Sequence, residues 1–319
     1  MTGAVLVTGA AGFIGSHVCE ALLARGERVI GLDNFDPYYD PAFKRRNLAE
    51  FSQNPNLTFL EADVRDAALL REAVAAREID RIVHLAALAG VRASIDRAAD
   101  YVAVNVTGTV NVLEAARAGR VKHMVVVSTS SVYGSTDRIP FVEDDSADRP
   151  LAPYPASKRA AELMAHAYFN LFKLPIAIVR LFSVYGPRGR PDMMPYQIAQ
   201  SLTRGEPITL FDNGQMHRDW TYVSDIVAGI VGALDHPRGF DVYNLGRGEP
   251  VLMADFVQIL EELTGRSALV KNVPAPPSEP PRTYADVSRA RAAFGYKPQV
   301  PVADGLAKFW EWFQEKDEG

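Results

Sequence analysis

Short apolar runs rich in β-branched residues alternate with longer helical patterns along the first 183 residues. The runs that predict strands span residues 4–8, 28–32, 57–60, 81–85, 122–128 and 175–181. Strands that are apolar on both faces and separated by helices are typical of a parallel sheet covered on each side. The pattern therefore predicts an α/β fold with a doubly wound parallel sheet.

The alternation of strand and helix patterns ends after about Val184. Turns rich in glycine and proline follow, with helical patterns at 192–204 and 224–235 and a short strand at 242–245. We therefore expect one large domain, residues 1–183, with excursions of the chain between lobes, and a smaller α/β C-terminal lobe formed mainly by residues 184–319. The proline-rich run 274–281, PAPPSEPP, is either an interdomain linker or a loop. A helical pattern resumes after it, which favours the loop.

Composition excludes several classes of protein. Hydrophobic residues make up 48% of the chain and charged residues 23%, which is close to the globular norm, and no apolar run approaches the roughly 18 residues of a membrane span. The net charge of -5 argues against nucleic-acid binding. Cys19 cannot form an internal disulfide, and the chain enters its first strand without a signal-like segment, so we expect a cytoplasmic location.

The first strand leads directly into a glycine-rich turn that opens a helix. Gly9, Gly12 and Gly15 stand in TGAAGFIG, with Phe13 and Ile14 between the last two glycines and further apolar residues at helical spacing after them. Glycine is needed where a turn is tight and where the backbone approaches a pyrophosphate at a helix N-terminus. The turn predicts a Rossmann-type dinucleotide site within residues 1–183, although a merely structural glycine turn is the alternative.

An acidic residue ends the second strand, where a dinucleotide site holds the adenosine ribose. Asp33 lies 18 residues after Gly15 and is followed by Asn34. A carboxylate there accepts bonds from ribose hydroxyls and repels a 2′-phosphate, which favours NAD over NADP. Asp63 and Val64 follow the third strand and are expected beside the adenine. The alternatives are a turn-forming aspartate at Asp33 and a helix cap at Asp63.

Tyr154 and Lys158 are four residues apart in a helical pattern, so they share one helix face. A nearby ammonium lowers the pKa of a phenol from about 10 towards neutrality and makes it a usable general base. Most such pairs lie on ordinary helix surfaces, but this pair follows the fifth strand and its hydroxyl cluster, residues 128–131. The position favours a catalytic role.

The glycine spacing together with YPASK at 154–158 resembles the extended short-chain dehydrogenase/reductase family, end to end along the chain. Further matches are HLAA at 84–87, Asn105, STSSVYG at 128–134, YGPR at 185–188 and RDWTYVSD at 218–225. The resemblance implies that Lys158 holds the nicotinamide ribose and that Thr129, or else Ser130, bonds the reacting hydroxyl. It also implies contacts with NAD from Leu85, Ala86, Ala87 and Asn105. A polar strand end that caps the next element is the alternative for either hydroxyl.

The branch of the family is indicated by the residues before Val132. Relatives that are nucleotide-sugar dehydratases carry Asp-Glu there, and hexuronate decarboxylases carry Glu in the second position. This chain has Ser130 and Ser131. The missing acid favours the nucleotide-sugar epimerase branch.

Three segments, 33–48, 89–94 and 181–193, look like those of UDP-glucuronate 4-epimerases. The resemblance implies a sugar carboxylate bound by Ser183, where the family commonly has threonine, and Arg190. It also implies that Arg218 and Arg282 bind the diphosphate. Arg92 and Ser94, in the 89–94 segment, are expected to contact the substrate. The alternatives are a solvated surface arginine at Arg190, a structural partner of Asp219 or Asp225 at Arg218, and plain exposure of Arg282.

The resemblance thus implies interconversion of UDP-glucuronate and UDP-galacturonate through a 4-keto sugar and transient NADH, with residues 1–183 binding NAD and 184–319 mainly the nucleotide sugar. The rivals are a 4-epimerase of neutral UDP-hexoses such as UDP-glucose, a UDP-glucuronate decarboxylase that manages without the glutamate, and a non-catalytic NAD-binding protein. We expect no metal. The family resemblance also implies a homodimer that pairs through the helices after the fourth and fifth strands.

Overall fold

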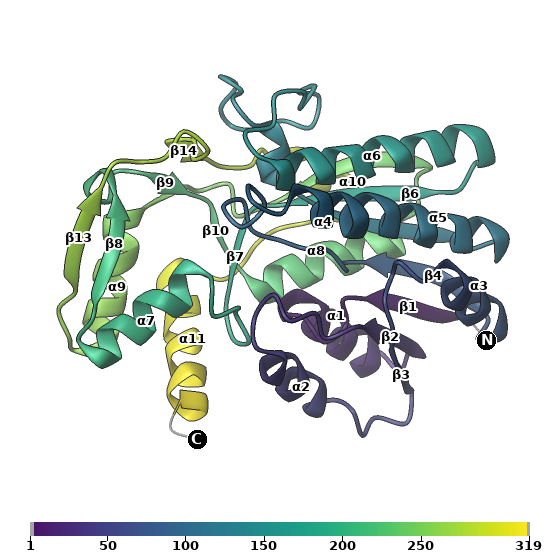
Figure 1. The fold of residues 1–319 in the computed structure, drawn as a ribbon, viewed down its shortest axis with the longest axis horizontal. Coiled ribbons are helices and arrows are strands. Elements are labelled where there is room, and N and C mark those ends of the chain that lie inside the picture. The colour runs from purple at the N-terminus through teal and green to yellow at the C-terminus, as the bar shows by residue number, and fades with distance from the viewer. Residues whose placement is uncertain (1–2, 318–319) are drawn as a thin grey trace.

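The computed structural model describes residues 3–317, and a seven-stranded parallel sheet between two layers of helices forms its main body (Figure 1). In spatial order the strands are β11 (Phe240–Leu245), β6 (Ile176–Leu181), β5 (His123–Thr129), β4 (Ile79–His84), β1 (Ala4–Thr8), β2 (Val29–Asp33) and β3 (Leu57–Glu61). The order along the chain reverses between β1 and β4. In doubly wound sheets such a reversal opens a ligand-binding crevice at the carboxyl ends of the strands. The predicted α/β fold with a doubly wound parallel sheet is confirmed.

Alternating side chains of β1 enter two separate cores. Val5 and Val7 pack with α1 (Phe13–Ala24) and α8 (Val223–Asp235), while Ala4 and Leu6 pack with the helices on the opposite face. Those helices are α3 (Ala67–Ala76), α5 (Gly108–Ala118) and α6 (Pro153–Phe172). The short α4 (Ala98–Tyr101) and the π-helical η1 (Val102–Thr107) lead directly into α5. Both faces of β1 are therefore buried away from solvent, as its uninterrupted apolar sequence predicts.

The smaller lobe lies at one end of the sheet in Figure 1 and is built around α7 (Met194–Arg204), α9 (Met253–Thr264) and α11 (Val302–Asp317). Its strands form three small sheets: β8 (Pro207–Phe211) with β13 (Leu269–Val273), β7 (Ser183–Tyr185) with β10 (Trp220–Tyr222), and β9 (His217–Arg218) between β12 (Val251–Leu252) and β14 (Arg282–Thr283). The remaining short elements are α2 (Pro41–Ala49), η2 (Ser130–Tyr133), η3 (Asp212–Gly214) and α10 (Ser288–Phe294). The proline-rich run 274–281 connects β13 to β14 within the smaller lobe. The prediction that this run is a loop, and not an interdomain linker, is confirmed.

One strand lies elsewhere than expected. The sequence placed residues 242–245 in the smaller lobe, but β11 pairs in parallel with β6 along all six residues and completes the large sheet. The chain thus returns to the main body after β10, and α8 covers its face. A short half-buried strand carries no local signal for the sheet that it joins, because only its long-range partner decides this.

Within residues 3–317, no helix combines the length and apolar character needed to cross a bilayer.

Candidate active site

A cleft with a cavity volume of about 290 Å³ opens at the carboxyl ends of the strands, and its wall includes residues of both the large sheet and the smaller lobe. Most expected site residues line it: Gly9, Gly12, Phe13, Ile14, Gly15, Asp33, Asn34, Asp63, Val64, Leu85, Ala86, Ala87, Thr129, Tyr154, Lys158, Ser183 and Arg190.

The glycine turn fits a dinucleotide pyrophosphate. Gly9 has φ +72°, a conformation that side-chain-bearing residues rarely adopt, and a Cβ on Gly15 would lie 2.0 Å from the carbonyl oxygen of Gly9. Among the described residues, no side chain caps the start of α1, which follows Gly12. The first N–H groups of this helix and its positive dipole end are therefore available to an anion in the cleft.

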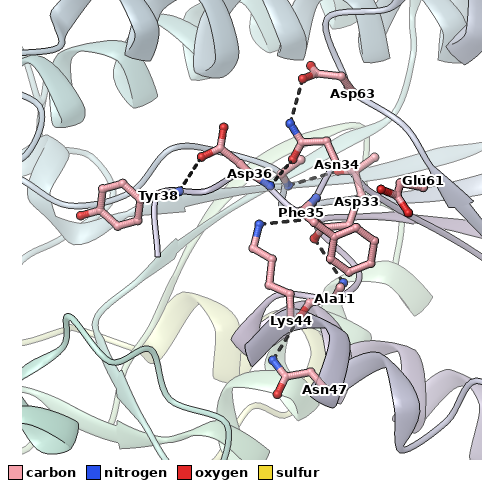
Figure 2. A network of polar contacts seen from close by, with 12 residues as sticks. Ala11, Asp33, Asn34, Phe35, Asp36, Tyr38, Lys44, Asn47, Glu61 and Asp63 are labelled. Carbon is pink, nitrogen blue, oxygen red and sulfur yellow. Dashed lines mark hydrogen bonds and ion pairs between the residues drawn. The ribbon is translucent and has the colours of Figure 1, made fainter. Parts of the chain in front are cut away.

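The end of the cleft beyond the glycine turn is acidic and tightly hydrogen-bonded (Figure 2). Asp33 accepts bonds from the backbone N–H groups of Ala11 and Phe35, so it shapes the turn as well as facing the cleft. Asn34 donates to Asp63 at 2.8 Å. Hydrogen bonds from Arg65 lower the pKa of the Asp63 carboxyl to about 2, below its ordinary value. Both carboxylates line the end of the cleft where the sequence predicts the adenosine.

Asp63 does not cap a helix. The residue that caps α3 is Asp66, whose side chain accepts from the N–H groups of Ala68 and Leu69. The alternative interpretation of Asp63 is therefore wrong, and its position in the cleft wall agrees with the expected one.

Tyr154 and Lys158 both face the cleft from α6, as their helical spacing predicts. Burial lowers the pKa of the Lys158 ammonium to about 8, although the charge of Glu162 one turn further along the helix opposes this. Burial also raises the pKa of the Tyr154 phenol above its ordinary value, against a hydrogen bond with Thr129 and the charge of Arg190.

The sequence assigned the charge that favours the phenolate to Lys158, and this role stays a prediction. The structure adds Arg190, whose charge lowers the pKa of Tyr154. Arg190 lies outside α6, so the helical spacing could not indicate it.

Asn105 stands behind the cleft wall. Its amide accepts from the backbone N–H of Leu88 and donates to the carbonyl of the same residue and to Ser157. Next to it, the buried His84 ring bonds Thr8 and Thr109 through its two nitrogens, and burial lowers its pKa to about 3. These contacts hold the segment 85–88, which includes three of the expected NAD contacts, in place.

The two candidate hydroxyls face different spaces. Thr129 lines the cleft beside Tyr154, whereas Ser130 lines an adjoining pocket of about 160 Å³. Ser183 borders both spaces. The geometry thus favours Thr129 over Ser130 as the hydroxyl nearest the reacting group.

Arg190 is not a solvated surface residue. Its side chain is 20% exposed and lines the cleft, and its Nε and Nη2 donate to Asp192 at 2.9 and 2.7 Å. The hydroxyl of Tyr38 donates to the same carboxylate, and the guanidinium lies 5.6 Å from the Tyr38 ring centre. The outcome is a cation held in position in the same cleft that Ser183 and Tyr154 line.

Arg218 lies in the adjoining pocket, where its Nη2 donates to Glu279 at 2.9 Å. Its expected alternative partners are engaged elsewhere, since Asp219 accepts three backbone N–H groups and Asp225 accepts from Val300. Arg92 is exposed and lies 3.5 Å from Glu279. Glu279 therefore joins both arginines from the proline-rich loop.

Four expected residues line neither space: Asn105 and Arg92, described above, and Ser94 and Arg282. Ser94 is fully buried and its hydroxyl donates to the carbonyl of Val91, so it shapes its loop. Arg282 is exposed and stacks on Tyr284, while its strand neighbour Thr283 lines the adjoining pocket. Successive side chains of a strand point to opposite faces, so Arg282 points away.

Several lining residues had no assigned role in the sequence: Tyr38, Tyr39, Lys44, Met193 and Glu279. Tyr38, Tyr39 and Lys44 belong to a segment that the sequence singled out without giving its side chains a role. Glu279 had no signal, because it lies in the proline-rich loop far along the chain from Arg218.

Residues 5–246 match the model of the NAD dependent epimerase/dehydratase family. A probable UDP-glucuronate 4-epimerase from Rhizobium meliloti is 39% identical over 329 residues, covering 97% of this chain and 96% of that protein. UDP-glucuronic acid 4-epimerase from Bacillus cereus, solved with UDP-glucuronic acid and NAD, has a TM-score of 0.92 at 35% identity over 98% of this chain and 99% of that one.

The dTDP-glucose 4,6-dehydratase from Streptomyces venezuelae, solved with NAD, also has a TM-score of 0.92, at 34% identity over 99% of this chain and 98% of that one. Equal TM-scores mean that the backbone alone does not separate an epimerase from a dehydratase. The side chains around the reacting centre have to do so.

Proposed function

The chain belongs to the NAD dependent epimerase/dehydratase family, and from this membership we propose a UDP-glucuronate 4-epimerase that interconverts UDP-glucuronate and UDP-galacturonate through a 4-keto sugar. The observation that carries the proposal is the set of side chains around Tyr154. Ser183 and Arg190 line the same cleft, whereas the carboxylates in its described wall lie at the end of β2 or in the segments after β2 and β3: Asp33, Asp36 and Asp63.

Bound NAD supplies a hydride acceptor and donor for C4 of the sugar. Tyr154 takes the proton of the C4 hydroxyl and later returns it, with the Thr129 hydrogen bond and the Arg190 charge favouring the phenolate. Lys158, a buried cation four residues along α6, holds the ribose next to the nicotinamide. The glycine turn and the start of α1 hold the pyrophosphate.

The absence of an acid beside Thr129 distinguishes the possible fates of the 4-keto sugar. Loss of water from C5 and C6 needs an acid and a base near the ring, and the two positions before Val132 carry only the hydroxyls of Ser130 and Ser131. The sugar is then left to accept hydride on its other face. Epimerisation is the outcome that these residues support.

A carboxylate clamp has a specific purpose in this reaction. A 4-ketohexuronate is a β-keto acid, which loses carbon dioxide when its C5–C6 bond stands perpendicular to the carbonyl plane. Charge-assisted bonds from Arg190 and a hydroxyl bond from Ser183 keep the carboxylate out of that geometry while the ring turns over. Arg190 is preorganised for this task because Asp192 and Tyr38 hold it.

The ring can turn over only while the nucleotide stays bound. We assign the diphosphate to the adjoining pocket, since Arg218 lines it and Ser183 borders both spaces. Guanidinium suits multi-point phosphate contacts, and a diphosphate carries more charge than the carboxylate of Glu279 that now pairs with Arg218. Arg282 contributes only if its loop rearranges.

We also propose that two copies pair through α5 and α6, in line with the sequence expectation. Leu163 and Leu171 on α6 and Val102 on η1, which leads into α5, are large apolar side chains that are 55%, 68% and 53% exposed. A cytoplasmic location stays an expectation from the sequence.

The test is to incubate the full chain separately with UDP-glucuronate and with UDP-glucose and to identify the products by NMR. UDP-galacturonate from the first, formed faster than UDP-galactose from the second, supports the proposal. Faster conversion of UDP-glucose would assign a neutral-hexose 4-epimerase. A UDP-pentose as the main product would assign a decarboxylase.

A further inference from the structure

Three cations line the cleft within the described part of the chain: Lys44, Lys158 and Arg190. Lys158 and Arg190 belong to the reacting end and already have roles. Lys44 comes from α2, and its ammonium lies 3.2 Å from Oδ1 of Asp33 (Figure 2). It is therefore a cation at the end of the cleft that receives the adenosine ribose, and it has no assigned role.

The helix that carries Lys44 is fixed to the glycine turn. α2 starts at Pro41 with Asp40 accepting from the N–H of Ala42, and Asn47 donates to the carbonyl of Ala11 at 3.1 Å. The side chains of Lys44 and Asp33 are only 12% and 3% exposed. The ammonium therefore has a defined position against the carboxylate, unlike a lysine that sweeps through solvent.

The charge balance of this end of the cleft differs from that of an isolated aspartate. Asp33 receives one N–H bond on each oxygen, from Ala11 and Phe35, and Lys44 adds a full positive charge beside Oδ1. A lone carboxylate excludes a 2′-phosphate, which carries about 1.5 to 2 negative charges near neutral pH. A carboxylate with a neighbouring ammonium carries no net charge, and the ammonium retains N–H groups for a ribose hydroxyl or a phosphate oxygen.

We propose that Lys44 sets the cofactor specificity of the cleft: by pairing with Asp33 it weakens the exclusion of 2′-phosphorylated dinucleotides and gives the ribose 2′ position a cationic partner. Asp33 and Lys44 then act in opposite directions. The carboxylate favours NAD, and the ammonium reduces the margin by which NAD is preferred over NADP.

The test measures dissociation constants of NAD⁺ and NADP⁺ for the full chain, stripped of co-purified dinucleotide, by isothermal titration calorimetry. K44M leaves Asp33 without its counter-ion, so the ratio of the NADP⁺ constant to the NAD⁺ constant rises at least tenfold. K44R keeps the charge and keeps the ratio within about threefold of the unsubstituted chain. D33N leaves the ammonium unopposed and lowers the ratio.

R46M is the matched control, because Arg46 is exposed on the same helix, stacks on Phe43 and does not line the cleft. It removes one positive charge and leaves the ratio unchanged. The inference is overturned if K44M leaves the ratio unchanged, whether both cofactors bind as before or both weaken equally. Because no turnover is measured, this outcome is independent of whether the chain is an epimerase.

Discussion

Replacing Arg190 with glutamine removes a charge that acts on two groups at once. Arg190 lines the cleft beside Ser183, where we place the sugar carboxylate, and its charge lowers the pKa of Tyr154 against the larger effect of burial. The first effect concerns only a substrate that carries a carboxylate. The second concerns every substrate that gives a proton to Tyr154, so the two effects can be separated by the choice of sugar.

The size of the first effect follows from the kind of bond that is lost. A hydrogen bond to a charged group contributes about 1.5–3 kcal/mol, and each 1.36 kcal/mol is a factor of about ten, so kcat/KM for UDP-glucuronate falls about 10- to 150-fold. The second effect raises the pKa of Tyr154, which reduces the phenolate fraction near neutral pH. The rate with either substrate then recovers as the pH increases.

The assay is a pH series of kcat/KM with UDP-glucuronate and with UDP-glucose, together with the fraction of carbon dioxide released. R190Q should lose activity with both sugars near neutral pH, keep a deficit only for UDP-glucuronate at high pH, and release more carbon dioxide. R188Q is the control, because Arg188 lies in the same loop but pairs with Glu20 at 2.7 and 2.9 Å and does not line the cleft. Equal losses with both sugars at every pH would refute the carboxylate clamp.

Three further substitutions test other parts of the account. Y154F should leave NAD binding intact in calorimetry and reduce turnover at least about 100-fold; unchanged turnover removes Tyr154 from the mechanism. E162Q breaks a buried pair in which Glu162 and Arg180 are each 1% exposed, so urea unfolding should show a loss of about 3–5 kcal/mol at neutral pH, and a loss below about 1 kcal/mol contradicts this. Burial opposes ionisation of Glu162, yet hydrogen bonding and the charge of Arg180 outweigh burial and hold the pKa of Glu162 below its ordinary 4.5. The stabilisation from this pair is present above pH 4.5 and is lost as the pH falls through the lowered pKa. The difference in unfolding free energy between E162Q and the unsubstituted chain should therefore shrink in acid. G15A places a Cβ 2.0 Å from the carbonyl oxygen of Gly9 and should weaken NAD binding at least about tenfold in calorimetry, whereas unchanged affinity would show that the turn can shift without consequence.

The parts of the site that the sequence predicts are those set by local geometry. Gly9, Gly12 and Gly15 signal their turn because a tight approach of backbone to backbone leaves no room for a Cβ. Tyr154 and Lys158 share a face because a helix has 3.6 residues per turn. Thr129 lies at the end of a strand whose apolar sequence predicts that both of its faces are buried.

The parts that the sequence does not predict depend on contacts between distant elements. Glu279 reaches Arg218 across 61 residues, and no local pattern in the proline-rich loop indicates a partner. Arg282 belongs to a strand of two residues, where a shift of one position decides whether a side chain faces the pocket or solvent. Lys44 stands in a basic run, and only the packing of α2 on the glycine turn selects it over Arg45 and Arg46 as the partner of Asp33.

The most direct test of the central claim follows the hydrogen at C4. The full chain is incubated in ordinary water with UDP-glucuronate that carries deuterium at C4, and the product is examined by NMR. The account predicts UDP-galacturonate that retains the deuterium at C4, because the same hydride leaves and returns within one cleft. Product with ordinary hydrogen at C4, or a UDP-pentose in its place, would contradict it.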